Sequence, residues 1–166
     1  MAIQIEDIIK TEYINPALKA KTRDQALMEL MEKGVSGITD KEQVFQALVA
    51  REAEFTTKLM EYIAIPHAKS EAIDKAMVLI GKSADGIDWR PDADFETSAA
   101  EDRVKVMFMI LVPGNQEGNE HLKILALLAR CLSKKDFRET VMNEMDTAKI
   151  SEFILEEIKK KQAARK

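Results

Sequence analysis

The sequence predicts an α/β fold: a single three-layer α/β/α domain with a mixed β-sheet flanked by helices on both faces. Strand-like and helix-like segments alternate along the 166 residues, without repeats or low-complexity linkers. The run from Val104 to Val112 shows no polar alternation after Lys105, which is typical of a strand covered on both faces. Amphipathic segments supply about five helices, and a helical bundle alone would leave the strands unexplained.

Length and composition agree with one domain over residues 1–166. The chain is 46% hydrophobic, enough for one sizeable core. Its net charge of −4 comes from charges of both signs and gives no basic footprint for nucleic acid and no polybasic face for a membrane. The longest apolar run is too short to cross a bilayer and no signal-peptide layout is present, so we expect a cytoplasmic protein without membrane insertion. Residues 159–166 should form a solvated basic tail.

Two helices are expected in the first third of the chain. Residues 22–33 begin with a capping box at Thr22 and stop at Gly34. The next helix should start at Thr39 or Asp40, since each precedes a Glu or Gln by three residues.

The apolar face of this second helix is extended by Arg51. Val44, Ala47 and Leu48 recur at helical spacing before it, so the arginine is expected to face inward. The alternative interpretation is a charge that snorkels at the helix end, where a cation also suits the helix dipole.

Three strands are expected, and the first leads to one of the 2 histidines. Residues 62–65 are β-prone, and Pro66 keeps the preceding residue extended while donating no hydrogen bond. The ladder should therefore finish there, with His67 at the strand end. A second strand over 76–81 should end in a turn at "ADGIDW", and the third, over 104–112, should be central.

Three helices are expected after the last strand. The stretch "PGNQEGNE" breaks the chain, and Asn119 can cap a helix over 120–132. The second histidine, His121, falls in the first turn of that helix. Further helices are expected over 135–143 and 147–160.

Most common catalytic motifs are missing from the sequence. The 6 glycines never approach a phosphate-loop spacing, and no HxxxH, HExxH or CxxC pair suggests a metal site. No nucleophile elbow surrounds a serine. The single cysteine, Cys131, lies in an apolar helix and is expected to pack in the core. Histidine chemistry is what remains.

Imidazole is a competent nucleophile at neutral pH when one nitrogen is free and a partner holds the other. A phosphohistidine would need anion stabilisers nearby, and Arg51 and the helix start at His121 are candidates. Spacing alone does not bring these residues together. A structural turn histidine at His67 and a plain helix-start residue at His121 stay open as alternatives.

Four segments together resemble one protein family. "IAIPHA" (63–68) resembles the phosphorylation motif of the enzyme IIA domains of the bacterial sugar phosphotransferase system, fructose/mannitol type. "AREAEFTT" (50–57) is similar to the Arg-Glu segment of that family, and "GIDW" (86–89) to its Gly-hydrophobic-Asp-Trp turn. "HLKILALLARCL" (121–132) resembles its His-Leu helix. The segments follow the family's order and cover about residues 5–158.

The resemblance implies a three-layer α/β/α domain that works as a phosphotransferase component. His67 would accept a phosphoryl group from the histidine phosphocarrier protein HPr and pass it to a cysteine of an enzyme IIB domain of a sugar permease. His121 and Arg51 would stabilise the phosphate, and no metal or nucleotide cofactor is implied. A regulatory, nitrogen-type relative that acts by phosphorylation-dependent docking is the main alternative, and a binding module without phosphoryl chemistry is a third.

Two departures from the family pattern stand out. Lys58, Met60 and Tyr62 occupy positions where the family usually has glycine, so the local turn geometry or the choice of partner is expected to differ. The segment that follows Trp89, residues 90–102, is longer than usual and is expected to be a surface excursion.

Overall fold

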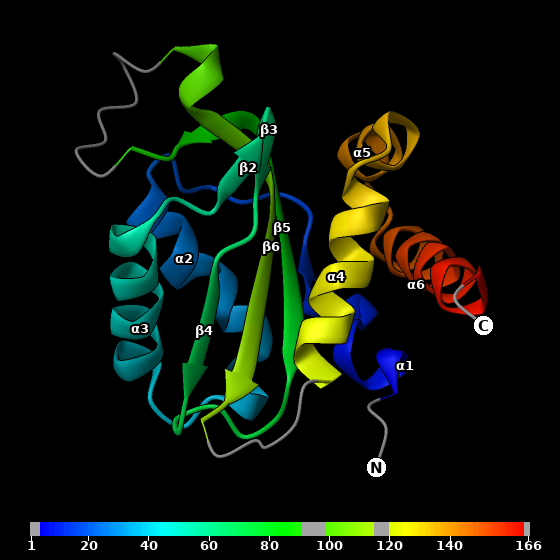
Figure 1. Cartoon of the computed structure of the whole chain (residues 1–166). Helices are drawn as coiled ribbons and strands as arrows, with labels where there is room; N and C mark the ends of the chain where they lie inside the picture. Colours follow the sequence, from blue (N-terminus) through cyan, green and yellow to red (C-terminus); the bar gives the residue numbers. More distant parts are fainter. Residues whose placement is uncertain (1–3, 91–98, 115–119, 165–166) are drawn as a thin grey trace.

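A mixed six-stranded sheet forms the centre of the computed structural model, which describes residues 4–90, 99–114 and 120–164 (Figure 1). Its strand order is β1-β5-β6-β3-β2, and β4 also pairs with β6. β6 runs antiparallel to β5 and parallel to β3 and β4, so the expected mixed sheet and central last strand are confirmed. The strands are β1 Ile14–Asn15, β2 Lys58–Met60, β3 Tyr62–Ala64, β4 His67–Ser70, β5 Met77–Asp88 and β6 Arg103–Pro113.

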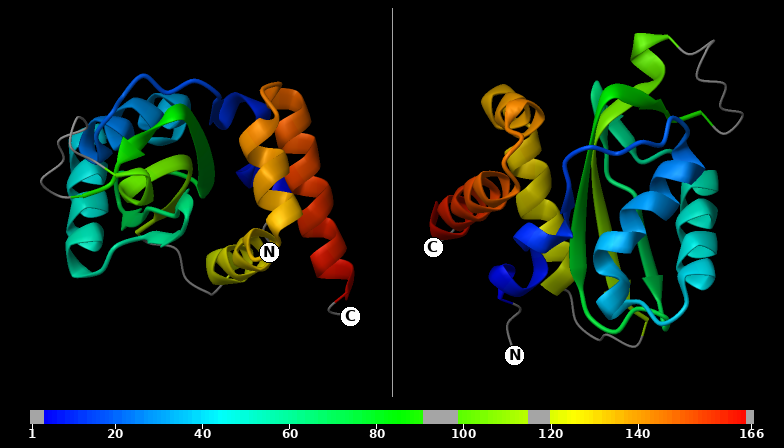
Figure 2. Two further views of the ribbon diagram at one scale, coloured as in Figure 1. Left: turned by 90° about the horizontal axis from the view of Figure 1, so that it is seen from above. Right: turned by 180° about the vertical axis from the view of Figure 1, so that it is seen from behind.

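Helices cover both faces of the sheet, as the sequence predicts. Figures 1 and 2 show α2 and α3 over one face and α4 and α6 over the other, with α1 beside the second pair. The α-helices are α1 Ile5–Ile8, α2 Arg23–Met31, α3 Lys41–Glu54, α4 Glu120–Leu132, α5 Lys135–Asn143 and α6 Thr147–Ala164. Short 3-10 helices are η1 Thr11–Tyr13, η2 Glu32–Gly37 and η4 Ala100–Asp102.

The sheet divides the core into two apolar clusters, and β6 contributes to both. Phe108 and Ile110 pack in the cluster under α4 and α6, whereas Met107 and Met109 pack in the cluster under α2 and α3. Burial of each such side chain stabilises the folded state by about 1.5–3 kcal/mol relative to leaving it exposed. Because β6 is covered on both faces, apolar residues are favoured on both, and its sequence lacks polar alternation. Cys131 is buried in the first cluster, as expected, and burial raises the pKa of its thiol.

Several helix boundaries agree with the sequence pattern and two differ. Asp40 is the N-cap of α3, and its carboxylate accepts a hydrogen bond from the Gln43 N–H at 3.1 Å. The first predicted helix ends at Met31 and continues as the 3-10 helix η2. The last helix, α6, runs to Ala164, so it includes most of the expected basic tail.

The predicted turn at "ADGIDW" is wrong, because β5 continues through it to Asp88. The pairing of β5 with β6 is irregular between Lys82 and Ile87, and the extra residues of β5 form a bulge there. Gly86 has φ +87° there, and its N–H donates to the Ser83 hydroxyl at 3.1 Å. The turn chemistry therefore bends a strand without ending it.

The ladder also resumes beyond Pro66, where the sequence predicts that it finishes. β3 ends at Ala64, the Ile110 N–H donates to the Pro66 carbonyl at 2.9 Å, and β4 starts at His67. A proline removes one donor but keeps its carbonyl, so the interruption is local. His67 is thus the first residue of a strand.

Most of the expected surface excursion over 90–102 lies outside the described residues, because 91–98 are not described, and it stays a prediction. Trp89 itself is buried, and η4 leads back into β6. Throughout 4–90, 99–114 and 120–164, every helix is too short or too polar to cross a bilayer.

Candidate active site around His67

His67 is the first residue of β4, a strand that lies between β6 and the helix α3 (Figure 1). Its backbone pairs in parallel register with Ile110 of β6, and its side chain is half-buried. Strand pairing on one side and the rigid Pro66 before it hold the backbone of this residue in place. The imidazole can still be reached from solvent.

The two ring nitrogens of His67 have different partners. Nδ1 lies 3.1 Å from the carbonyl oxygen of Ile65, which can only accept, so Nδ1 carries the proton. Nε2 lies 3.0 Å from Nε of Arg51, which can only donate, so Nε2 must present its lone pair. These partners assign a neutral imidazole whose basic nitrogen faces a guanidinium.

Arg51 reaches His67 from the last turn of α3. Its Nη1 donates to the carbonyl of Phe55 at 2.7 Å, which satisfies a carbonyl just past the helix end. The structure therefore brings Arg51 and His67 together, which spacing alone did not predict and the family resemblance implied.

A buried carboxylate next to this arginine was not predicted as part of the site. Glu52 is 6% exposed, and it accepts four hydrogen bonds. Two come from Thr57, by its N–H at 2.8 Å and its hydroxyl at 2.6 Å. The others come from the Thr56 hydroxyl at 3.0 Å and from the indole N–H of Trp89 at 2.8 Å. The only sequence signal was the presence of the Glu and the Trp in two of the family-like segments.

Glu52 is connected to the histidine through the loop that it holds. The carbonyl of Thr57 accepts the N–H of Ile65 at 2.9 Å, and the carbonyl of Ile65 in turn holds Nδ1 of His67. The carboxylate thus ties the end of α3, the loop after it and Trp89 to the backbone that orients the imidazole.

Comparison with known proteins identifies the family. Residues 7–157 match the family model described as phosphoenolpyruvate-dependent sugar phosphotransferase system, EIIA 2. The chain belongs to this EIIA family. It is 33% identical over 155 residues to a fructose-specific EIIA component of the phosphotransferase system from Haloferax volcanii, covering 92% of this chain and 95% of that protein. It is 35% identical over 147 residues to a nitrogen regulatory protein of Bradyrhizobium diazoefficiens, covering 88% and 91%.

Solved structures agree with this family assignment. The nitrogen regulatory protein IIA-Ntr from Neisseria meningitidis superposes with a TM-score of 0.74 at 26% identity, over 91% of this chain and 98% of that one. The mannitol IIA of Escherichia coli shares the fold, with a TM-score of 0.65 at 24% identity over 87% and 97%. The predicted EIIA-type fold is therefore confirmed.

The second histidine of the EIIA-like pattern is placed only by its backbone. His121 lies in the first turn of α4, as predicted, but its side chain lies outside the described part of the structure. The phosphate-stabilising role that the family resemblance implies for His121 stays a prediction.

One of the substituted glycine positions keeps the backbone conformation that glycine favours. Tyr62 has φ +69°, the one positive φ at a non-glycine residue in the described chain, whereas Lys58 and Met60 lie in β2 without it. This conformation costs an L-residue roughly 1–2 kcal/mol. The predicted effect on the local turn is thus backbone strain at the start of β3.

Two large apolar side chains are exposed in the segment that follows α3. Phe55 is 75% exposed and Leu59 is 55% exposed, both in the segment between α3 and β3. Within 4–90, 99–114 and 120–164, no group of three or more His, Cys, Asp and Glu side chains could hold a metal ion. The site offers an imidazole nitrogen without a proton, which accepts a hydrogen bond from the guanidinium of Arg51.

Proposed function

We propose that this EIIA domain is a phosphocarrier, which accepts a phosphoryl group on Nε2 of His67 from HPr and passes it to a cysteine of an enzyme IIB domain. The observation that carries the proposal is the pair of bonds that orients the imidazole. Nδ1–H is held by the Ile65 carbonyl while Nε2 keeps its lone pair next to Arg51. A nucleophile needs this division of roles between its two nitrogens.

The transfer proceeds by in-line displacement at phosphorus. The Nε2 lone pair forms the new N–P bond while the N–P bond of the phosphohistidine donor breaks, and its electron pair returns to the donor imidazole. The positive charge that develops on the His67 ring is spread to Nδ1–H, which is already bonded to the Ile65 carbonyl. Onward transfer reverses the roles: a thiolate attacks phosphorus and Nε2 recovers its lone pair.

Arg51 has two positions in this scheme. In the free domain its Nε–H occupies the Nε2 lone pair, so the guanidinium must move aside as phosphorus approaches. It then donates to two phosphoryl oxygens, a bidentate contact that a lysine cannot make. We assign His121 the second stabilising role, because the start of a helix offers free N–H groups and the positive end of its dipole to an anion.

Partner proteins would dock around His67, and the half-buried ring with the exposed Phe55 and Leu59 suits that use. The complex of enzyme IIA mannitol with phosphorylated enzyme IIB mannitol from Escherichia coli shares the fold at 23% identity, which makes a IIB domain a reasonable acceptor here. We further propose that the domain works in the cytoplasm, where a phosphocarrier meets both partners.

A regulatory role is the second candidate. Both the Bradyrhizobium relative and the Neisseria structure are named nitrogen regulatory proteins. In this version His67 is phosphorylated in the same way, and the phosphoryl state controls docking to another protein. Efficient onward transfer to a IIB cysteine would favour transport, and a stable phosphorylated form in the presence of IIB domains would favour regulation.

The decisive experiment follows label from radioactive phosphoenolpyruvate through the general transfer proteins. Wild type should gain an acid-labile, base-stable phosphoryl group, and His67→Gln should gain none while keeping its fold. His121→Gln is the matched control: it should accept label and donate it more slowly, by about 10²–10³. Label that persists in His67→Gln and vanishes in His121→Gln would reverse the two assignments, and an unlabelled wild type would refute the carrier function.

A further inference from the structure

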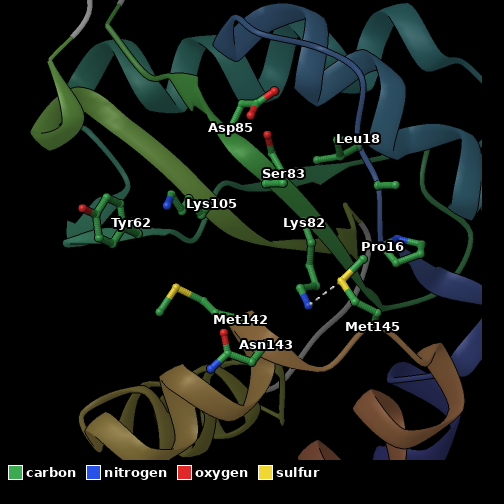
Figure 3. Close-up of a pocket in the computed structure, with 12 residues that line it drawn as sticks. Pro16, Leu18, Tyr62, Lys82, Ser83, Asp85, Lys105, Met142, Asn143 and Met145 are labelled. Carbon is green, nitrogen blue, oxygen red and sulfur yellow. Dashed lines mark hydrogen bonds between the residues drawn. The ribbon is translucent and has the colours of Figure 1, made fainter.

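A second site lies apart from His67, in a cavity of about 450 Å³ between the sheet and the C-terminal helices. Strands β3, β5 and β6, the segment after β1, the end of α5 and the turn that follows α5 supply its walls (Figure 3). None of His67, Arg51 and Glu52 lines it. The phosphoryl chemistry proposed above therefore makes no use of this cavity.

One wall carries a buried lysine from the middle of β5. Lys82 is 4% exposed, and its ammonium donates to the Glu144 carbonyl at the C-terminal end of α5 and lies 3.7 Å from the sulfur of Met145. Burial lowers the pKa of Lys82, and the Glu144 carboxylate opposes this shift. The carbonyl and the thioether sulfur take two of the three N–H donors, and neither group carries a charge that neutralises the ammonium.

A second lysine faces the same cavity beside an aromatic ring. Nζ of Lys105 lies 4.8 Å from the ring centroid of Tyr62, a cation–π contact. Neither Lys82 nor Lys105 has a carboxylate within 4.0 Å among the described residues. Among the described residues that line the cavity, two are lysines and one, Asp85, is acidic.

Backbone strain in the same wall is an independent observation. Tyr62 holds φ +69°, where a glycine would be free of strain. Strain of this kind persists where surrounding contacts over-determine it, and ligand clamps are one such place. The strained residue is also the one whose ring positions the ammonium of Lys105.

We propose that this cavity binds a small organic anion, with a carboxylate or phosphate group between Lys82 and Lys105 and an apolar body against Met142 and Met145. Figure 3 shows the two methionines on the helix side of the cavity, opposite the strands that carry the lysines. The anion supplies a counter-charge at ion-pair distance, which neither ammonium group has among the described residues, and the thioethers adapt to its shape.

Nuclear magnetic resonance titration of the full chain tests the proposal with three separate probes: inorganic phosphate, glycerol 3-phosphate and succinate. We expect saturable shifts of the amides of Lys82, Ser83 and Met145. A response to glycerol 3-phosphate identifies a phosphate ester as the ligand class, and a response to succinate identifies a carboxylate. Shifts confined to Arg51 and His67 would mean that the probe binds only the phosphoryl site, and would overturn the proposal.

Variants test whether Lys82 and Lys105 bind the anionic probes. Lys82→Met and Lys105→Gln should each weaken probe binding about tenfold, the loss expected for one charge-assisted hydrogen bond. Lys33→Gln, at an exposed lysine of η2 outside the cavity, should bind as wild type does. Should Lys82→Met not fold, the surface-proximal Lys105→Gln decides alone. Unchanged affinity in the folded lysine variants, or no cavity shifts with any probe, refutes the site.

Discussion

Replacing Glu52 by alanine should destabilise the domain far more than its position beside a solvent-facing loop suggests. The carboxylate is 6% exposed and accepts the Thr57 N–H and the Trp89 indole N–H, both at 2.8 Å. Glu52→Ala leaves these two donors in a buried site, and each unsatisfied donor costs about 1–3 kcal/mol. Water can enter the space and recover part of the loss, so we expect a decrease of about 2–4 kcal/mol in the free energy of unfolding.

Glu52→Gln is the matched control for this prediction. An amide oxygen in the place of Oε1 keeps the bonds from Thr56, Thr57 and Trp89, and the amide nitrogen can donate to the Thr57 hydroxyl after it rotates. The free energy of unfolding should then fall by about 1 kcal/mol, because only the contribution of the negative charge to these hydrogen bonds is lost. Urea denaturation followed by circular dichroism gives both values, and fluorescence adds a local reading because Trp89 is the only tryptophan. A loss below about 1 kcal/mol in Glu52→Ala would refute the argument that this carboxylate holds the loop.

Three further predictions concern the site and its surroundings. Arg51→Lys should fold normally and slow phosphoryl transfer to and from His67 by about ten- to a hundredfold, measured by rapid-quench kinetics; unchanged rates would reduce Arg51 to a helix-end charge. Tyr62→Gly should relieve the strain of φ +69° and raise the free energy of unfolding by about 1 kcal/mol, less the lost cation–π contact; a clear loss of stability would contradict the strain argument. The pKa of Glu6 lies below its ordinary value of 4.5, chiefly through its hydrogen bond to Lys159, so this pair stabilises the fold above that pH and less as pH falls through the lowered pKa. Glu6→Gln should therefore lower the melting temperature at neutral pH and not at strongly acid pH.

The helices and strands that the sequence predicted correctly are those whose hydrophobic pattern or cap lies within the element itself. The buried strand β6 was recognised from its continuous apolar run, and α4 and α5 have the predicted boundaries. The strands β1, β2 and β4 were not predicted, since two to four residues carry no periodicity and are strands only because they pair with neighbours.

The candidate site also depends on contacts between distant segments, which the local sequence does not reveal. Arg51 was expected to face inward from the helical stripe, yet its bond to a histidine 16 residues away comes from the tertiary fold. Glu52 looks like an ordinary helical surface residue in the sequence. Its bonds from Thr56 and Thr57 are local, whereas the bond from Trp89, 37 residues further on, comes from the tertiary fold. Long-range contacts of this kind have no local signature, so a family-like segment can mark such a residue without explaining it.

Arg51 and Glu52 are consecutive, and their opposite environments suit what the proposed transfer demands. Neighbouring helical residues point about 100° apart, so one side chain can face the imidazole while the other is buried. Arg51 is half-buried and must leave Nε2 before phosphorus can reach it. Glu52 is held by four hydrogen bonds that keep the end of α3 fixed while the arginine moves. Because the helix end stays fixed, rotation of the Arg51 side chain alone lets the guanidinium stop donating to Nε2 and donate to phosphoryl oxygens instead. The Ile65 carbonyl that orients Nδ1 is undisturbed by this change.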